Sequence, residues 1–205
     1  MKSRVIRAIA LIAIVAGFSV SIYLASEPVK LEKGLWFGDQ ARALPEFELV
    51  DHNNEPLTRE RLKGNWNLMF FGYTHCPDIC PTTLLDMNRM VKAIDDPDVL
   101  EALTVYFVSV DSGRDTPDVL AEYVKYFNPG FIGATAPDEK LRPLTRMLGI
   151  AHEIHKTSED DLTYGVDHSG AVVLINPEAE YAGLFSAPHD PSSMARDMTR
   201  IVEYN

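Results

Sequence analysis

The two cysteines of the chain, Cys76 and Cys80, lie in the stretch GYTHCPDICP and are separated by three residues. The stretch stands where an apolar run, 66–72, gives way to a helical pattern. Backbone N–H groups and a helix N-terminus at such a point favour thiolate over thiol, which suits nucleophilic attack as well as metal binding. If Cys80 lies in the first helical turn, both sulfurs can bind one ion. A third ligand must then come from elsewhere in the chain.

Two buried strands with a helix between them are expected to position this cysteine pair. The runs 66–72 and 103–110 are apolar, β-branched and aromatic, as in strands buried on both faces. Between them, one helical face carries Leu84, Met87, Val91 and Ile94. Strand, helix and strand in this order predict a right-handed βαβ unit with parallel strands. Active groups in open α/β sheets gather at the carboxyl ends of such strands, where the cysteines lie.

Further elements are predicted around this unit. The expected elements are a hairpin that opens at 47–54, helices over 116–127 and 137–149, an antiparallel hairpin formed by 171–175 and 181–185, and a last helix from Asp190-Pro191. Pro143 inside the second of these helices argues against its continuity. Together the elements predict an α/β fold of thioredoxin type, a mixed sheet flanked by helices.

The N-terminus predicts a transmembrane helix. Residues 1–7 form a basic flank, and residues 8–25 are an uncharged, mostly apolar run. A helix of that length is close to the thickness of a bilayer core. A cleaved signal peptide is the alternative, but Tyr23 stands where a small residue is needed before a cleavage site. We therefore expect an uncleaved anchor at 8–25.

The anchor sets the expected domain organisation and location. Because the basic residues precede the apolar run, the N-terminus is expected to stay in the cytoplasm and the rest to be exported. Residues 26–44, with mixed charges and a proline, are expected as a linker, and residues 45–205 as one domain. The expected location is the inner membrane, with the domain in the periplasm, or the mitochondrial intermembrane space in a eukaryote.

The exported part is strongly acidic. The chain has 19 basic and 30 acidic residues and a net charge of −11. Without Lys2, Arg4 and Arg7, 16 basic residues face 30 acidic ones, which gives −14. Phosphate backbones repel such a domain, so we expect no nucleic-acid partner.

Several motifs together resemble the Sco/SenC family of copper-binding proteins. The matching segments are 72–84, Val108-Ser109-Val110-Asp111, Arg114-Asp115-Thr116-Pro117 and Val166-Asp167-His168-Ser169. The resemblance covers nearly the whole exported domain. It implies a membrane-anchored thioredoxin fold and a role in building the binuclear copper centre of cytochrome c oxidase. The implied partners are a copper donor protein and the copper-accepting oxidase subunit.

The resemblance also implies a ligand set of Cys76, Cys80 and His168. The sequence departs from the family pattern at Ser112, Gly113 and Ser169, none of which is an implied ligand. Two soft thiolates and one imidazole suit one Cu(I) per chain in trigonal geometry, and Cu(II) could add an oxygen ligand. A structural zinc would need a fourth protein ligand, and none is evident.

Four neighbouring residues are candidates for supporting roles. Asp167 could orient His168 or add negative charge beside it. For His75 we favour a role in stabilising the loop over one in binding metal. Asp78 either tunes the thiolate charge or is solvated. Asp111 either ends its strand beside the cysteine loop or serves the following turn.

Two functions of different classes fit these residues. The first is a copper chaperone that hands its ion to the oxidase subunit by ligand exchange. The alternative is an enzyme, a thiol-disulfide oxidoreductase that reduces the cysteines of that subunit or of other exported proteins. Segment 166–169 lacks the cis-proline that many thioredoxin-type reductases place beside the redox pair, which favours the metal. A disulfide with a purely structural role is a third interpretation of the cysteine pair.

Other potential ligands are interpreted structurally. His152 and His155 would point to opposite faces of a strand, so they are not expected to chelate an ion together. Met87, Met194 and Met198 recur at helical spacing and are expected in the core.

Overall fold

A computed structural model describes Gly17 and residues 29–156, 158 and 163–204, and the folded unit extends from Leu31 to the C-terminus. The expected basic flank and almost all of the expected anchor lie outside these residues. Within the described part of the chain, no helix has the length and apolar character needed to cross a membrane.

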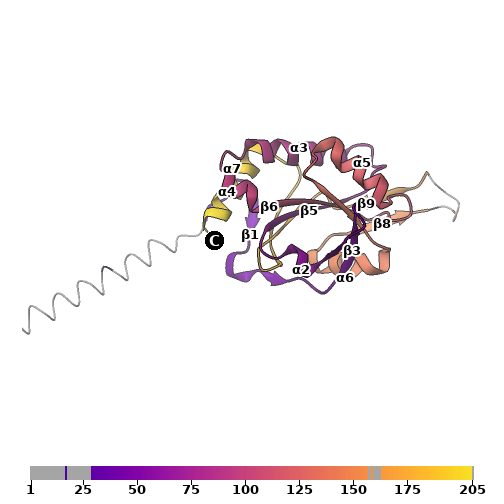
Figure 1. The fold of residues 1–205 in the computed structure, drawn as a ribbon, viewed down its shortest axis with the longest axis horizontal. Helices are drawn as coiled ribbons and strands as arrows, with labels where there is room; N and C mark the ends of the chain where they lie inside the picture. The colour runs from indigo at the N-terminus through magenta and orange to yellow at the C-terminus, as the bar shows by residue number, and fades with distance from the viewer. Residues whose placement is uncertain (1–16, 18–28, 157, 159–162, 205) are drawn as a thin grey trace, which may run out of the picture. The chain divides into compact units, whose positions relative to one another are not determined.

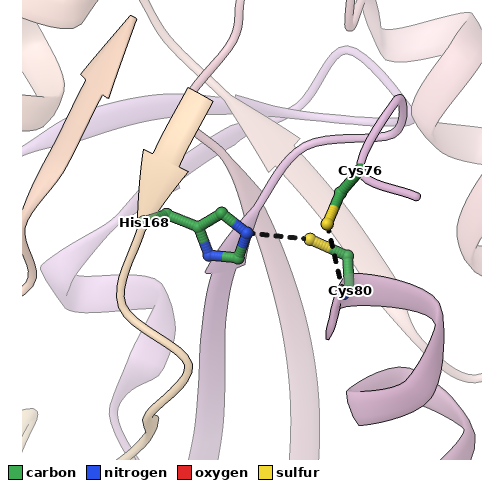
Figure 2. A group of neighbouring side chains, drawn as sticks. All are labelled: Cys76, Cys80 and His168. Atoms are coloured by element: carbon green, nitrogen blue, oxygen red, sulfur yellow. Dashed lines mark hydrogen bonds between the residues drawn. The ribbon is translucent and has the colours of Figure 1, made fainter. Parts of the chain in front are cut away.

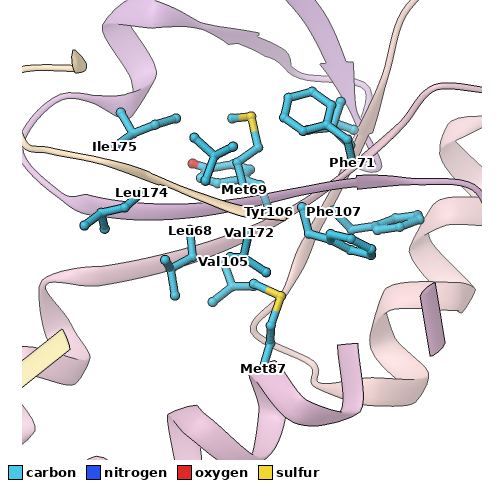
Figure 3. Close-up of a cluster of buried hydrophobic side chains, with 14 of the residues drawn as sticks. Leu68, Met69, Phe71, Met87, Val105, Tyr106, Phe107, Val172, Leu174 and Ile175 are labelled. Atoms are coloured by element: carbon cyan, nitrogen blue, oxygen red, sulfur yellow. The ribbon is translucent and has the colours of Figure 1, made fainter. Parts of the chain in front are cut away.

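Three parallel strands form the middle of the main sheet. They are β5 (Trp66–Gly72), β6 (Leu103–Ser109) and β7 (Ile132–Thr135). Trp66 pairs with Leu103 and Tyr106 with Ile132, so the strands run in register. Every residue of β5 is buried, the polar Asn67 included, as its mostly apolar run predicted. The large side chains of these strands alternate between the two faces of the sheet, and Leu68, Val105 and Phe107 lie on the same side as Met87 of α3 (Figure 3).

Antiparallel strands extend the sheet on both sides, in the order β1-β11-β10-β5-β6-β7-β3-β4. The flanking strands are β1 (Gly34–Trp36), β2 (Arg42–Ala43), β3 (Glu48–Asp51), β4 (Pro56–Thr58), β10 (Val172–Ile175) and β11 (Glu180–Phe185). The sheet is therefore mixed, with both predicted hairpins present. The prediction missed β7, because Gly133 and Ala134 give this short strand little strand character. Gly133 instead lets the sheet approach Leu120 closely.

The segment expected as a linker is partly folded. β1 and β2 both pair with β11, so the folded unit begins well before residue 45. The carboxylate of Asp197, fully buried in the last helix, accepts hydrogen bonds from the backbone N–H groups of residues 32, 33 and 34 at 2.8–2.9 Å. The mixed charges and the proline of this stretch do not predict β1, whose partners β11 and Asp197 come from the other end of the chain.

Helices cover both faces of the sheet. They are η1 (Gly38–Gln40), α2 (Arg59–Leu62), α3 (Ile79–Ala93), α4 (Pro97–Glu101), α5 (Pro117–Phe127), α6 (Asp138–Leu148) and α7 (Pro191–Tyr204). Figure 1 shows α3, α5 and α7 on one face and α2 and α6 on the other. α5 begins as predicted, with the Thr116 hydroxyl accepting from the N–H of Val119. α6 continues through Pro143, so the proline does not end it.

A second, two-stranded sheet stands apart from the main one. It consists of β8 (His152–His155) and β9 (Gly165–His168), with His152 directly opposite His168. We refer to β8 and β9 together as the histidine arm. The prediction treated segment 166–169 as a loop; the structure places its first three residues in a strand.

Candidate metal site

The cysteine loop follows the carboxyl end of β5. Gly72 ends the strand, and Cys80 is the second residue of α3. The N–H of Cys80 points at the sulfur of Cys76, 3.5 Å away, so a helix N-terminus faces that sulfur as predicted. Both cysteines are free thiols in this structure, with Cys76 9% exposed and Cys80 fully buried.

His168 reaches this pair from the histidine arm, 88 residues further along the chain. Its Nε2 lies 3.2 Å from the sulfur of Cys80, and one ligand atom from each of Cys76, Cys80 and His168 lies within 4.8 Å of the others (Figure 2). Nδ1 lies 3.1 Å from the carbonyl oxygen of Ser169, to which it donates as the protonated nitrogen. The lone pair of Nε2 is then directed at the sulfurs, as a metal ligand requires.

Close packing holds the three side chains in place. A Cβ on Gly72 would lie 2.6 Å from the sulfur of Cys80, so only glycine leaves room for that sulfur. The ring of His168 packs edge-on against Tyr73 and Phe70, with centroid distances of 5.7 and 6.0 Å. The imidazole is therefore oriented by aromatic contacts on one side and by its hydrogen bond to Ser169 on the other.

Burial disfavours the charged forms of Cys80 and His168 when no metal is bound. Burial raises the pKa of the Cys80 thiol, and electrostatic interactions with Cys76 and Asp115 raise it further, against a backbone hydrogen bond from Tyr73 that lowers it. Burial also lowers the pKa of His168. A cation that binds here must displace the proton of Cys80, and the positive charge of the cation then stabilises the buried thiolate.

The four candidate supporting residues lie around the site without reaching its centre. His75 is 56% exposed on its side chain and contacts the hydroxyl of Thr74 at 3.0 Å, consistent with the loop role that we favoured. Asp78 is exposed, and its side chain makes no capping hydrogen bond to α3. Asp167 pairs with His155 at 2.8 Å, on the opposite face of the arm from His168.

The fourth, Asp111, serves the turn after β6 and not the cysteine loop directly. It is buried and accepts hydrogen bonds from Arg114 and from the hydroxyl of Tyr164. The sequence left both roles open; the contacts of Asp111 lie within the turn, to Arg114, and outside it, to Tyr164.

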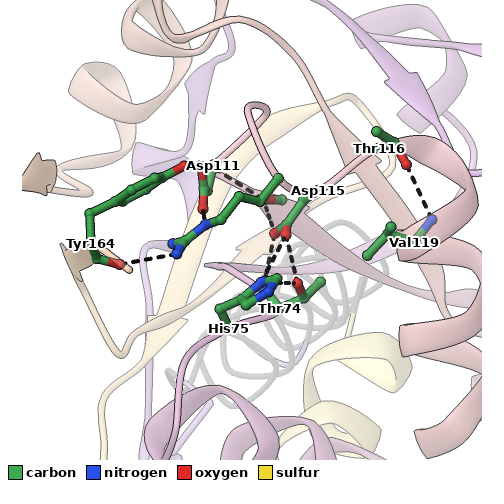
Figure 4. Close-up of polar contacts among 9 residues, drawn as sticks. Thr74, His75, Asp111, Asp115, Thr116, Val119 and Tyr164 are labelled. Atoms are coloured by element: carbon green, nitrogen blue, oxygen red, sulfur yellow. Dashed lines mark hydrogen bonds and ion pairs between the residues drawn. The ribbon is translucent and has the colours of Figure 1, made fainter. Parts of the chain in front are cut away.

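Sequence reasoning missed one buried carboxylate. Asp115 accepts from the N–H of Thr74 at 2.9 Å, from the Thr74 hydroxyl at 2.6 Å and from the Ser109 hydroxyl at 2.5 Å (Figure 4). It thus fixes the start of the cysteine loop. Its only signal in the sequence was its place in a family motif, because local spacing does not link positions 74 and 115.

The other potential ligands have the structural roles expected of them. The imidazole of His152 pairs with Asp138 at 2.7 Å, and that of His155 with Asp167. The methionines at 87, 194 and 198 are at most 1% exposed and belong to the core. Within the described residues, the cysteine pair with His168 is the one group that offers three potential ligand atoms at this spacing.

The fold and this group define a thioredoxin-type protein with a candidate soft-metal site, composed of two sulfurs and one imidazole. A family model described as SCO1/SenC matches residues 38–203, so the chain belongs to the SCO1/SenC family.

Relatives and solved structures agree with this assignment. The chain is 34% identical over 199 residues to an "SCO2-like protein" of Rickettsia felis, covering 95% of this chain and 96% of that one. Among solved structures, it is similar to Arabidopsis thaliana ScoI with copper bound (31% identity, TM-score 0.70, 78% of this chain and 98% of that one). It is also similar to Bradyrhizobium japonicum ScoI with copper bound (29% identity, TM-score 0.68, 77% and 98%).

Proposed function

We propose that this protein is a membrane-anchored copper chaperone that delivers copper to the binuclear copper centre of cytochrome c oxidase during its assembly. The observation that carries the proposal is the convergence of Cys76, Cys80 and His168 within 4.8 Å. The similarity to two solved ScoI structures with copper bound supports it.

The donor set suits copper as cargo. Two thiolates and an imidazole satisfy Cu(I), a soft d¹⁰ ion that accepts three ligands, whereas structural zinc favours four. An ion with three ligands can accept one more from a partner, so it can pass between proteins without being released to water. A surface hollow of about 300 Å³ reaches His168 and is lined by Ala151, His152, Glu153, Asp167, His168 and Ser169. This hollow offers the partner's ligand a route to the ion on the histidine side.

The proposed partners and location follow from this role. The receiver is the copper-accepting oxidase subunit, and a separate donor protein supplies the ion. The apolar run at 8–25 anchors the chain in the inner membrane, with the domain in the periplasm or the mitochondrial intermembrane space.

Anaerobic Cu(I) titration of the reduced protein tests the proposal. We expect one copper per chain, held against a chromophoric Cu(I) chelator. Loss of a ligand in His168→Ala should weaken binding at least as much as the roughly 10-fold to 100-fold that loss of a ligand-orienting residue costs. His155→Ala is the matched control, because it removes an exposed histidine from the same arm. If the wild-type protein competes no better than a small dithiol, the chaperone function is wrong.

The alternative is a thiol-disulfide oxidoreductase, and the two adjacent free thiols favour it. The Cys76 thiolate would attack a substrate disulfide and release one substrate thiolate. Cys80 would then attack the mixed disulfide, releasing the second substrate thiolate and leaving a Cys76–Cys80 disulfide. This activity needs no imidazole at position 168. Disulfide reduction that is fast in the wild type and unchanged in His168→Ala, together with weak copper binding, would favour the enzyme.

A further inference from the structure

Two halves of the candidate site come from separate parts of the fold. The cysteines belong to the β5–α3 connection, at the edge of the main sheet, whereas His168 belongs to the histidine arm, which is a sheet of its own. Something must therefore set the distance between the arm and the cysteine loop.

The turn between β6 and α5, residues 110–116, contacts both halves. On the cysteine side, Asp115 accepts the three hydrogen bonds from Thr74 and Ser109 described above. On the histidine side, Asp111 accepts from the hydroxyl of Tyr164, the residue that precedes β9. Figure 4 shows Tyr164 beside Asp111 and Thr74 beside Asp115, so each carboxylate of the turn contacts a different half of the site.

Arg114 strengthens the contact to the arm. Its Nε donates to Asp111 at 2.5 Å, and its Nη1 donates to the carbonyl oxygen of Tyr164 at 3.1 Å. The guanidinium carbon lies 3.6 Å from the ring centroid of Tyr164 and 5.7 Å from that of Tyr73. Its side chain is only 8% exposed, so these contacts are shielded from water. Tyr73 in turn packs edge-on against His168, so Arg114 supports the imidazole from two directions.

The arm has a second attachment on its other strand. His152, directly opposite His168, pairs with Asp138 in α6, and the N–H of Ser169 donates to the carbonyl oxygen of Ala151. The first contact holds β8 to α6, and the second joins the two chain segments at that end of the arm. The Tyr164 contacts hold the start of β9, and through it His168, to the same turn that holds the cysteine loop.

We propose that the β6–α5 turn sets the separation between His168 and the cysteine pair, with Arg114 and Tyr164 as positioning residues that act on copper affinity only through His168. This inference rests on the proposed function, because it assigns the parts that shape the same site. Neither residue is a ligand. Their contribution is to reduce the freedom of the arm, so that the imidazole stands ready beside the sulfurs.

A double-mutant cycle tests the proposal in the reduced full chain. Tyr164→Phe keeps the ring against Arg114 and removes the hydroxyl bonded to Asp111. We expect it to weaken Cu(I) binding about tenfold against a chromophoric chelator, the lower end of the effect of residues that orient metal ligands. In a His168→Ala background, the same change should alter the affinity by less than about twofold. Equal losses in both backgrounds, or no loss in the wild type, would overturn the proposal.

Two further measurements complete the test. Arg114→Lys keeps the charge but not the planar stacking, and should behave as Tyr164→Phe does. Tyr106→Phe is the control, since it alters a buried tyrosine near Asp51 and Arg61, and should leave copper affinity unchanged. If it weakens binding as much as Tyr164→Phe does, the effect is not positional and the proposal is wrong.

A copper-free readout separates this inference from the function on which it rests. In the metal-free protein, Tyr164→Phe should speed amide hydrogen exchange in β8 and β9 and leave α3 unchanged. If the wild type binds copper no more tightly than a small dithiol does, the proposed chaperone function is wrong. The hydrogen-exchange rates of the arm then decide the positioning role by themselves. Unchanged exchange in the arm would refute that role.

Discussion

Replacement of Gly72 by alanine should damage both the fold and the metal site. A Cβ at this position would lie 2.6 Å from the sulfur of Cys80 and 2.9 Å from a ring carbon of Phe107. Carbon atoms in contact lie about 3.5–4.0 Å apart, so these neighbours must retreat by about 1 Å. Both side chains are fully buried and have little room to do so. Overpacking of this kind lowers the free energy of unfolding by about 1–3 kcal/mol.

The same clash should weaken copper binding. Cys80 can relieve it by turning its sulfur away from His168, which now lies 3.2 Å from it, and copper must then restore the strained position. Because 1.4 kcal/mol corresponds to a factor of ten, we expect the Cu(I) affinity of Gly72→Ala to fall by about 10-fold to 100-fold.

Urea denaturation of the metal-free protein and chelator competition measure the two effects separately. Gly165→Ala is the matched control, because a Cβ there meets no atom within 4 Å and the residue also lies in a strand. A Gly72→Ala protein as stable as this control, with unchanged copper affinity, would show that the site tolerates a methyl group. The argument from close packing would then be refuted.

Three further predictions concern single residues. Asp197→Ala removes a buried acceptor from three N–H groups and should lower the free energy of unfolding by about 2–4 kcal/mol, measured by urea denaturation. It should also speed proteolysis at Lys33, measured by timed digestion. Thr199→Ala is the control for both assays. Thr74→Val leaves Asp115 one donor short and should lower stability by about 1–3 kcal/mol by the same assay. Burial lowers the pKa of His189, so the unfolded chain binds a proton more readily and the metal-free protein should lose stability as the pH falls below about 6.5. In His189→Gln the free energy of unfolding should fall less steeply with pH. Equal slopes of this free energy against pH in the two proteins would contradict the prediction.

The carboxylates with lowered pKa values do not contribute to the loss of stability at about pH 6.5, because they are protonated only at lower pH. Hydrogen bonds and nearby arginines lower the pKa values of Asp51 and Asp138 despite their burial. The stability that these carboxylates contribute is present above their unfolded pKa of about 3.9 and is lost only below it. His168, whose pKa burial also lowers, contributes to the same window as His189, so the His189→Gln slope should be reduced and not abolished.

Much of the central fold was predictable because it depends on local patterns. The apolar runs of β5 and β6 and the capping residues of α5 are visible without knowledge of distant partners. β1 and β7 were not predictable, because Gly34 and Gly133 carry no strand signal and both strands depend on neighbours far away in sequence.

The candidate site divides in the same way. The cysteine pair and its helix N-terminus were evident from spacing, whereas His168 was singled out only by resemblance. Its position opposite Cys80 depends on tertiary contacts of an arm and a turn, such as that of Arg114 with Tyr164, which lie 50 positions apart. Asp115 had no assigned role for the same reason, since its hydrogen bond to Thr74 is a tertiary contact that no local sequence pattern indicates.

The attachment of the N-terminal strand to the end of the chain constrains the order of folding. β1 pairs with β11, and Asp197 accepts hydrogen bonds from the backbone at the start of β1 and just before it, 163 to 165 positions away. During synthesis the first strand therefore has no partner until the last two elements exist, and it must dock late. For a chain exported as proposed, this delay leaves the segment next to the anchor extended while the remainder crosses the membrane, and the domain closes only after its C-terminal helix has arrived.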